Sequence, residues 1–522
     1  MKISLLQKTF NASLSVFVKS NSLFNSLKFS NFFTKNKHKS LISNNFLKSI
    51  NIKNHSKIKM VETEKKGKEN KNEKDKNKFA VWEGILKNAE MGKVVTRFPP
   101  EPSGYLHIGH IKAVILNRHF ADIYQGKMLI RFDDTNPEKE SSEFADCIIE
   151  DLNTVGIKHD DLSYSTDFFE LCEKHMTKLI EEGKCYCDNT PVDKTREERD
   201  KGIPSQCRDV SPEENMKIWL QMIDKNIASD SPIKKYCVRG KIDYKNKNKC
   251  LRDPVFYRFC EKPHHRLGDS YKLFPMYDFS TAILDHKTGV THMLRTNEYA
   301  DRIPMYRWVE EALGLGTMNI FEYSRMNLVF TVLSKRKLKW LVENQKVDGW
   351  DDPRLPTLRG ILRRGVRIES IKNLILEIGP TTNSNLMQWD KLYSINRDII
   401  DPTAKRLFGV NSKSPVLVEI ENFDNSMANT IVDWHPKNKE IGQRTQIRSN
   451  KLFMEPEDAK DLVDDMKLTL YKWGNSRVTK LDRNENGEIT KVYLKVTPED
   501  LDFKKTKVAH WVSANEGDVS FF

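Results

Sequence analysis

The first 61 residues of this 522-residue chain contain no aspartate, no glutamate and no arginine. Their eleven lysines supply +11 of the formal net charge of +13. Residues 62–78 add +2, from seven lysines against five acids, so the rest of the chain is about neutral. A body without net positive charge has no global field to steer RNA, and any RNA contact must come from local patches.

This acid-poor segment is rich in Lys, Asn, Ser, Phe and Leu, a composition typical of organelle transit peptides. Its lack of arginine counts against that hypothesis, and Met60 offers an internal start that would give a cytosolic form. Both interpretations of residues 1–61 stay open: a mitochondrial or other transit peptide, or a disordered leader on a cytoplasmic protein. Residues 62–78 are almost all charged residues and Asn, so we expect a charged linker.

Long apolar runs and a regular cysteine pattern are also missing. No run approaches the roughly 18 apolar residues that a membrane span requires, so no membrane partner is expected. The eight cysteines are irregularly spaced and follow no secretory signal. This pattern favours reduced thiols in an intracellular enzyme over a disulfide framework.

The apolar pattern after the linker predicts alternating strands and helices. Val94–Phe98 and Met128–Phe132 are expected as buried strands. Amphipathic helices should follow them, from about His110 and over Ser142–Val155. A Pro-rich stretch directly after the first strand forbids helix and forces an extended loop. Strand–helix repetition of this kind indicates a parallel, doubly wound α/β sheet.

Later regions differ in composition. Residues 168–276 are charged and irregular and hold seven of the eight cysteines, so we expect an inserted domain. Strand-like segments return at Tyr277–Ile283 and Gly289–Leu294, and a helical pattern covers Lys337–Asn396. The rest of the chain alternates, as in Val416–Ile420, which predicts a β-rich C-terminal domain.

Arg97–His110, with the sequence RFPPEPSGYLHIGH, is the first chemical signature. Its loop places His107 and His110 at a helix start, where unpaired N–H groups and the helix dipole favour a phosphate. Gly109 lets a flat adenine approach the backbone. A bare His-x-x-His pair is more often two ordinary histidines, but the fourteen-residue context favours a nucleotide site.

Val332–Arg336, with the sequence VLSKR, is the second signature. On a loop, Ser334 and the cations that follow it would lie where a leaving pyrophosphate develops charge. That arrangement is electrostatic stabilisation of a transition state. Alone, a basic tetrapeptide is more often a solvated face or a localisation patch.

Together these signatures resemble the eukaryotic and archaeal type of the glutamyl- and glutaminyl-tRNA synthetase family, of class I. The resemblance runs from about Val94 to at least Asp401 and more weakly to the end of the chain. It implies ATP- and Mg²⁺-dependent ligation of an amino acid to tRNA through an acyl-adenylate, with no dedicated Mg²⁺ cage from the protein. The segments that carry it are Arg97–His110, Arg131–Pro137, Tyr277–Phe279, Val332–Arg336, Gly349–Arg354 and Arg359–Gly365.

The resemblance also implies a domain plan. It comprises a Rossmann-type class I catalytic domain, an inserted acceptor-end-binding domain, a helical stem-contact subdomain and a C-terminal β-barrel that binds the anticodon. Barrels of this family normally extend past the place where this chain stops, so a truncated barrel is expected. The expected ranges are 79–167 and 277–336 for the catalytic halves, 168–276 for the insertion, 337–400 for the helical subdomain and 401–522 for the barrel.

Arg295 bears on the choice between glutamate and glutamine. It matches the position where glutamyl enzymes carry Arg and glutaminyl enzymes typically carry an uncharged residue. A buried carboxylate needs a cation with bidentate donors, whereas a neutral amide would leave that cation unpaired. The alternative is a structural salt bridge with Glu298 or Asp301. The resemblance therefore predicts L-glutamate and tRNA(Glu) as substrates, with a glutaminyl enzyme or a non-catalytic tRNA-binding relative as alternatives.

The resemblance implies roles for the other site residues. Arg97 would pair with a substrate carboxylate and Asp133 with its ammonium, and Lys335 would stabilise the α-phosphate in the transition state. Acids beside strands are also common structural acceptors, which applies to Asp134, Asp278 and Asp285. The expected glutamate-binding residues are Arg97, Phe98, Pro99, Asp133, Tyr277, Asp278, Thr281 and Arg295; the expected ATP-binding residues are His107, Gly109, His110, Glu298, Leu333, Ser334, Lys335 and Arg336.

Five arginines between Arg354 and Arg367 have few acids near them in the sequence. They indicate phosphate contacts along an RNA stem, with a solvated, salt-bridged face as the alternative. The predicted tRNA-binding residues are Arg359, Arg363, Arg364 and Arg367. A partner in a multi-synthetase assembly or on a scaffold stays unknown.

Two patterns look like metal sites but do not predict one. Asp482–Gly487 matches the first half of a calcium loop, yet the twelfth position is Tyr493 where a bidentate Glu is needed. A hairpin turn explains it better, because Asn-Gly is a strong hairpin signal. Cys185, Cys187 and Cys207 supply three of the four ligands of a structural zinc site, so buried free thiols are expected instead.

Overall fold

The structure is a computed structural model that describes residues 82–514, apart from 229, 385 and 505. The expected leader at 1–61 and linker at 62–78 lie outside the described residues, as do the last eight residues of the expected barrel. Among the described residues, no helix has the length and apolar character needed to cross a bilayer.

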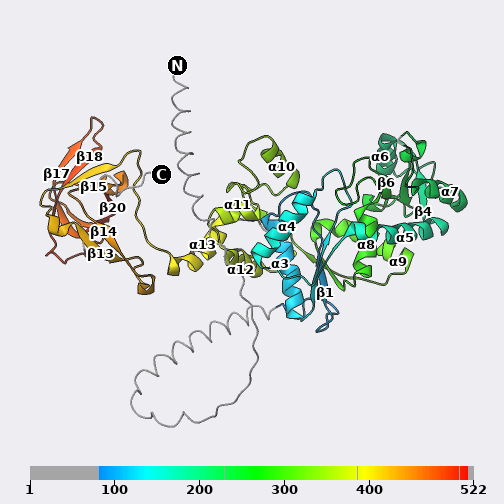
Figure 1. Ribbon diagram of the computed structural model, residues 1–522, viewed down its shortest axis with the longest axis horizontal. Helices are drawn as coiled ribbons and strands as arrows, with labels where there is room; N and C mark the ends of the chain where they lie inside the picture. Colours follow the sequence, from blue (N-terminus) through cyan, green and yellow to red (C-terminus); the bar gives the residue numbers. More distant parts are fainter. Residues whose placement is uncertain (1–81, 229, 385, 505, 515–522) are drawn as a thin grey trace, which may run out of the picture. The chain divides into compact units, whose positions relative to one another are not determined.

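Two parallel sheets that meet side by side form the centre of the region predicted to be catalytic (Figure 1). β1 (Val95–Phe98), β2 (Lys127–Phe132) and β3 (Asp161–Tyr164) pair in parallel, and so do β8 (His292–Thr296) and β9 (Asn319–Tyr323). The Thr291 amide before β8 donates to the Val95 carbonyl of β1 at 3.0 Å. The spatial order β3-β2-β1-β8-β9 is therefore doubly wound, with its switch point between β1 and β8. The predicted α/β fold is confirmed.

Two helices pack against this sheet, and local sequence explains where they begin. α3 (Ile108–Ile123) begins two residues before the expected start, because His107 caps it and accepts from the Gly109 amide. α4 (Ser142–Val155) has the bounds that the sequence predicted. The Ser141 hydroxyl accepts from the Phe144 amide at its start, and a glycine at φ 69° ends it. Side chains of both helices join the strands in one apolar core.

The inserted region has a four-stranded antiparallel sheet of its own, which lies at one end of the catalytic region in Figure 1. Its core also takes in α8 (Tyr277–Lys287) and α9 (Ile303–Leu313), so the insertion is anchored to the second half of the catalytic region. Its elements are α5 (Phe169–Glu181), β4 (Cys185–Asp188), α6 (Val192–Lys201), α7 (Pro212–Met222), β5 (Cys237–Gly240), β6 (Val255–Phe259) and β7 (Leu273–Pro275).

Three expected elements differ in the structure. The strand predicted at Tyr277–Ile283 is wrong, because these residues begin helix α8 and bury an apolar face; a short apolar run does not distinguish the two. The strand predicted from Gly289 begins at His292, since Gly289 adopts φ +74° in the turn after α8. The cations of the second signature lie in the first turn of α10 (Lys335–Glu343), not on a loop.

The helical pattern predicted for Lys337–Asn396 is confirmed. It comprises the rest of α10 together with α11 (Leu358–Arg363), α12 (Ile368–Ile378) and α13 (Trp389–Ile400). The two short strands β10 (Asn327–Leu328) and β11 (Leu386–Met387) pair in parallel beside them. The short 3₁₀ turns are η1 (Ser165–Phe168), η2 (Pro232–Lys235), η3 (Lys249–Leu251), η4 (Asn297–Arg302), η5 (Asp401–Thr403), η6 (Asn425–Met427) and η7 (Lys439–Ile441).

The C-terminal region is β-rich, as predicted, around a seven-stranded sheet in the order β19-β16-β17-β18-β12-β15-β20. Its edge strands are separated by one residue in the chain, so the sheet curls into a nearly closed barrel. The calcium-like segment connects two paired strands, and its Asn484 side chain accepts from the Glu488 amide at 2.9 Å. The elements are β12 (Val416–Ile420), β13 (Asn429–Asp433), β14 (Gln443–Ile447), β15 (Lys451–Met454), α14 (Pro456–Ala459), β16 (Lys467–Leu470), β17 (Gly474–Arg483), β18 (Ile489–Val496), β19 (Lys507–Ala509) and β20 (Trp511–Ser513).

Candidate functional site

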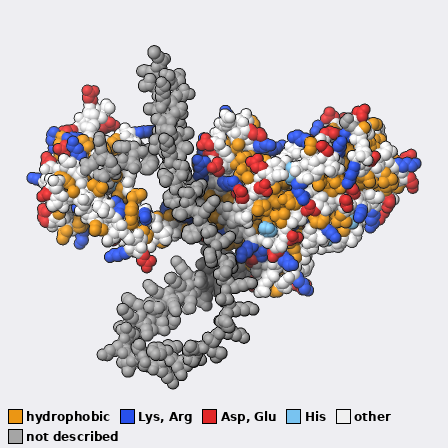
Figure 2. Space-filling model, viewed as in Figure 1, with side chains coloured by type: hydrophobic (Ala, Val, Ile, Leu, Met, Phe, Trp, Pro, Cys, Tyr) orange, Lys and Arg blue, Asp and Glu red, His pale blue; other side chains and the backbone are white. Residues whose placement is uncertain are grey.

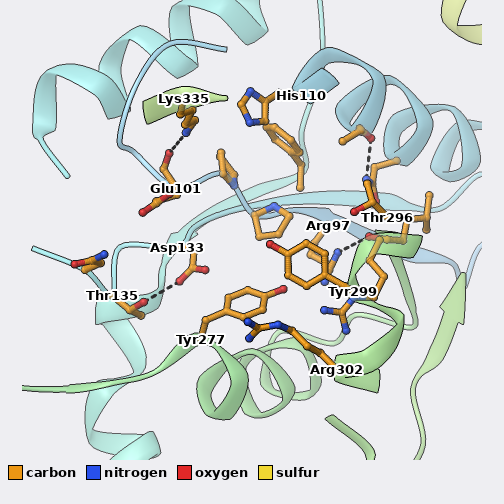
Figure 3. A pocket seen from close by; sticks show the side chains of 18 of the residues that line it. Arg97, Glu101, His110, Asp133, Thr135, Tyr277, Thr296, Tyr299, Arg302 and Lys335 are labelled. Carbon is orange, nitrogen blue, oxygen red and sulfur yellow. Dashed lines mark hydrogen bonds between the residues drawn. The ribbon is translucent and has the colours of Figure 1, made fainter. Parts of the chain in front are cut away.

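A cavity of about 500 Å³ opens at the carboxyl ends of β1 and β8, at the switch point of the sheet (Figure 3). Ligands of doubly wound sheets bind in this crevice. Figure 2 shows acidic and basic side chains interspersed on the visible face of the protein, consistent with a body that carries little net charge. The expected site residues that line the cavity are Arg97, Phe98, Pro99, His110, Asp133, Tyr277, Arg295 and Lys335.

The two histidines of the first signature lie together at the N-terminus of α3. Their rings stack with centroids 3.7 Å apart. His107 Nδ1 accepts from the Gly109 amide at 3.1 Å, and His110 Nδ1 accepts from the His107 amide at 3.2 Å. Burial lowers the pKa of His107 to about 3 and that of His110 well below its usual value. Both rings are therefore neutral and carry their proton on Nε2, as hydrogen-bond donors without charge.

Lys335 is the cation of the second signature. Its Nζ donates to the Glu101 carbonyl at 2.9 Å and to the Ser103 hydroxyl at 3.2 Å. Burial lowers the pKa of Lys335 to about 8. Lys335 makes no ion pair with a carboxylate among the described residues. It lines both the first cavity and a neighbouring one of about 650 Å³, whose lining includes Ser334 and Arg336.

Arg97 is held by an internal acid. The side chain is 2% exposed. Its Nε donates to both oxygens of Asp285 at 3.2 Å, and its Nη1 donates to the Leu294 carbonyl at 3.0 Å. Asp285 also accepts from Arg131 at 2.6 Å, and the two guanidinium groups hold its pKa below the usual value against the effect of burial. The single negative charge of Asp285 is thus shared between the two buried guanidinium groups of Arg97 and Arg131.

Arg295 is buried and has no acidic partner among the described residues. Its side chain lines the cavity and is 7% exposed, and its Nε has no hydrogen-bond partner in the described part of the chain. Neither acid of the alternative salt bridge, Glu298 or Asp301, pairs with Arg295 among the described residues, and Glu298 pairs with Arg325 at 3.1 Å instead. The guanidinium lies 4.9 Å from the centre of the Tyr299 ring. A cation with an unsatisfied donor therefore faces the cavity and favours an anionic ligand group.

Asp133 lies across the same cavity, near Tyr277 (Figure 3). Burial raises the pKa of Asp133 to about 7, because water cannot solvate its charged form. A ligand ammonium beside this carboxyl would favour its ionised form.

The structure does not bring every expected residue to the cavity. Asp278 pairs with Arg302, while Thr281 is buried inside α8. Asp134 is a structural acceptor for the Thr166 amide and hydroxyl, at 3.0 and 2.7 Å. Further residues that were not predicted for the site also line the cavity. Glu101 lies within the first signature, and Tyr299 and Arg302 both belong to η4. The full set is Glu101, Glu140, Arg258, Tyr299 and Arg302.

One group of side chains among the described residues has metal-ligand spacing: Asp134, His264 and His265. Asp134 and His264 are already engaged, whereas neither ring nitrogen of His265 has a hydrogen-bond partner among the described residues. Both Asp134 oxygens accept from Thr166, and the His264 ring contacts the Asp134 carbonyl through Nε2 at 2.9 Å and accepts from the Arg266 amide through Nδ1. A metal ion would have to displace these bonds, so we assign no metal site here.

Acids lie close to the arginine cluster in space, as the alternative of a salt-bridged face predicts. Arg354 pairs with Asp352 at 2.6 Å and Arg363 with Asp351 at 3.3 Å. Arg359 pairs with two acids of α4, which are distant in the sequence. The exposed side chain of Arg367 has neither a hydrogen bond nor an ion pair among the described residues. Contact of this cluster with tRNA stays a prediction.

The chain is similar to known proteins over most of its length. A family model for the catalytic domain of class I tRNA synthetases (E and Q) matches residues 93–402, and one for the anticodon-binding domain matches residues 404–497. The cytoplasmic glutamate–tRNA ligase of Arabidopsis thaliana is 45% identical over 78% of this chain and 56% of its own length. The Saccharomyces cerevisiae enzyme of the same name is 45% identical, over 82% and 59%.

Two further similarities are more distant or cover less of the other protein. The bifunctional glutamate/proline–tRNA ligase of Mus musculus is 43% identical over 83% of this chain and 28% of its own length. A crystal structure of glutamate-tRNA synthetase from Elizabethkingia anophelis is 17% identical, with a TM-score of 0.44 over 59% of this chain and 70% of that one. The chain spans less than two thirds of the length of these curated relatives.

Proposed function

The chain belongs to the class I tRNA synthetases for glutamate and glutamine, and from this membership we propose that it ligates L-glutamate to tRNA(Glu). The energy would come from ATP, through a glutamyl-adenylate. The observation that carries the choice of glutamate is the unpaired, buried guanidinium of Arg295 in the cavity.

Charge matching explains why this arginine favours glutamate. The carboxylate of the glutamate side chain can pair with Arg295 and use its free Nε–H. The amide of glutamine would leave the buried cation uncompensated, and an uncompensated buried charge costs about 3–5 kcal/mol. Arg97 would orient the α-carboxylate with its remaining edge, and Asp133 would accept from the ammonium group.

The nucleotide would bind at the other end of the cavity. The neutral His107 and His110 would donate to the triphosphate from the N-terminus of α3, where the helix dipole favours negative charge. Lys335 would lie near the α-phosphate. Mg²⁺ would enter with the phosphates of ATP and offset their charge, because two of the three members of the described group with metal-ligand spacing, Asp134 and His264, already use their ligand atoms.

The reaction then takes two steps. An oxygen of the α-carboxylate of glutamate attacks the α-phosphorus of ATP. The bond from this phosphorus to the oxygen that bridges to the β-phosphate breaks, and pyrophosphate leaves. A ribose hydroxyl at the tRNA end next attacks the acyl carbon, AMP leaves and the hydroxyl proton is lost to solvent. Lys335 would stabilise the negative charge that develops in the first step. Arg363, Arg364 and Arg367 are proposed contacts to the RNA stem.

The proposed compartment is the cytoplasm, since relatives from Arabidopsis thaliana and Saccharomyces cerevisiae are named cytoplasmic. Import directed by residues 1–61 stays a prediction.

A charging assay tests the proposed substrate. The purified chain is incubated with Mg²⁺–ATP, radiolabelled glutamate or glutamine, and tRNA(Glu) or tRNA(Gln). We expect glutamate to be preferred by about three orders of magnitude, as the loss of roughly 4 kcal/mol of charge pairing implies. Preference for glutamine would indicate a glutaminyl enzyme, and tRNA binding without charging would indicate a non-catalytic relative.

The activity should show a bell-shaped dependence on pH. Asp133 must lose its proton to pair with an ammonium, so kcat/KM for glutamate should rise as the pH passes about 7. Lys335 must keep its proton, so kcat/KM should fall above about 8. Steady-state kinetics at saturating tRNA, with ATP and glutamate both well below saturation, would report the pKa values of the enzyme before either ligand binds. A flat profile across this interval would contradict both assignments.

A further inference from the structure

The backbone around His107 is paired with a segment about 250 residues later in the chain. The Leu358 amide donates to the Leu106 carbonyl at 2.8 Å, and the Ile108 amide donates to the Pro356 carbonyl at 3.1 Å. His107 and Thr357 face each other in an antiparallel bridge. The position of the first histidine therefore depends on the start of α11.

Arg359, in the first turn of α11, ties this pairing to α4. Its Nε donates to Asp151 at 2.8 Å, and its Nη2 donates to Glu150 at 2.8 Å. Its guanidinium carbon lies over the Tyr105 ring, 4.8 Å from the ring centre. The same guanidinium thus binds two acids of α4 and contacts an aromatic ring that lies two residues before His107 in the chain.

Asp151 and Tyr105 each make further contacts that fix their positions. Asp151 is 2% exposed, and this burial raises its pKa, while Arg359 and the Leu106 amide act in the opposite direction and favour its charged form. Tyr105 stacks on Trp350, with centroids 5.4 Å apart and planes 16° apart. Residues 105 and 106 are therefore enclosed between α4, α11 and Trp350, and Arg359 contacts α4 and Tyr105 directly.

These contacts leave Arg359 little freedom to bind a phosphate. Its Nε and Nη2 are already used, and its side chain is 30% exposed. Binding a tRNA phosphate with these atoms would leave Asp151, nearly fully buried, without its cation. Arg367 differs, because its exposed side chain has no partner to lose among the residues described.

We propose that Arg359 is a positioning residue for the nucleotide site: through Asp151 and Tyr105 it holds His107 in place at the N-terminus of α3. It does not contact tRNA, and this replaces the role expected for it from the sequence. The inference rests on the proposed function, since it requires that ATP binds at His107 and His110.

Affinities for two ligands separate this role from a phosphate contact. In the full chain, Arg359→Gln should weaken binding of Mg²⁺–ATP about tenfold and leave tRNA affinity within about twofold at every salt concentration, because misplaced binding groups lose affinity for their own ligand. The matched control, Arg367→Gln, should leave ATP affinity unchanged. It should weaken tRNA binding and reduce the slope of log K against log salt by about one.

Two further variants separate positioning from a loss of folding. Arg359→Gln leaves the buried Asp151 without its cation, so the double variant Arg359→Gln/Asp151→Asn removes both charges. It should unfold near the wild-type temperature and still bind ATP weakly. Arg359→Lys keeps the charge without the planar fork and should not restore ATP affinity. A merely structural defect would lower the active fraction, and hence the apparent kcat, without raising KM for ATP.

The outcomes that overturn the proposal are equally definite. Unchanged ATP affinity in Arg359→Gln would do so, as would a loss of tRNA affinity and salt slope like that of Arg367→Gln. If the wild-type chain charges tRNA with glutamine, the assignment of glutamate is contradicted. The comparison of ATP affinity between Arg359→Gln and Arg367→Gln would still test the role of Arg359.

Discussion

Replacing Arg295 with alanine should lower kcat/KM for glutamate by about three orders of magnitude while ATP affinity stays within about twofold. The substrate carboxylate would enter a buried cavity and find no cation, at a cost of several kcal/mol. The guanidinium makes no ion pair among the described residues, so its removal leaves none of their carboxylates without a cation. Folding should therefore be little affected. Charging assays with labelled glutamate, together with a direct ATP-binding measurement, would check this result.

Arg302→Ala is the matched control for this variant. Arg302 lines the same cavity, but Asp278 already neutralises its charge. We expect its removal to lower kcat/KM for glutamate by less than about tenfold, because it offers no uncompensated charge to the substrate. Equal losses in the two variants would contradict the role given to Arg295, as would glutamate use that survives in Arg295→Ala.

Replacing Lys335 with methionine should lower the rate of adenylate formation by about 10²–10³-fold with little change in KM for glutamate. Removing one preorganised group that stabilises developing charge typically has an effect of this size on kcat. Methionine keeps the unbranched shape, so the packing around Ser103 should survive. Single-turnover measurement with saturating ATP and tRNA isolates the chemical step.

Lys339→Met supplies the control for the lysine variant. Lys339 lies one turn later on α10 and pairs with Glu343 at 3.6 Å. It lines the neighbouring cavity of about 650 Å³ but not the first cavity. Its loss should change the rate of adenylate formation by less than about threefold. A comparable loss from both variants would show that general positive charge, and not the buried ammonium of Lys335, supports the reaction.

Several parts of the fold could be predicted because neighbours in the chain decide them. Ser141 and Gly156 bound α4 at the residues that the apolar period indicated. The alternation in Val416–Ile420 marked β12, and the Asn-Gly turn marked the β17–β18 hairpin. The apolar run at Tyr277–Ile283 failed as a predictor, because burial of such a run suits a helix as well as a strand.

The candidate site was predictable in its residue types but not in its charge balance. Arg97, Arg295 and Arg359 look alike in the sequence, each as a cation in a recognisable segment. Asp285 compensates Arg97 from 188 residues away, and Asp151 compensates Arg359 from 208 residues away. No acid reaches Arg295 among the described residues.

The amino-acid sequence by itself determined the alternation of strands and helices, the histidines at a helix start and the lysine that complements them. These features depend on spacing, capping and propensity over a few residues. Only the tertiary structure decided which cations remain available to a ligand. That choice depends on which acids distant in the chain are packed beside each guanidinium, and the free energy of a buried charge is set by its partner.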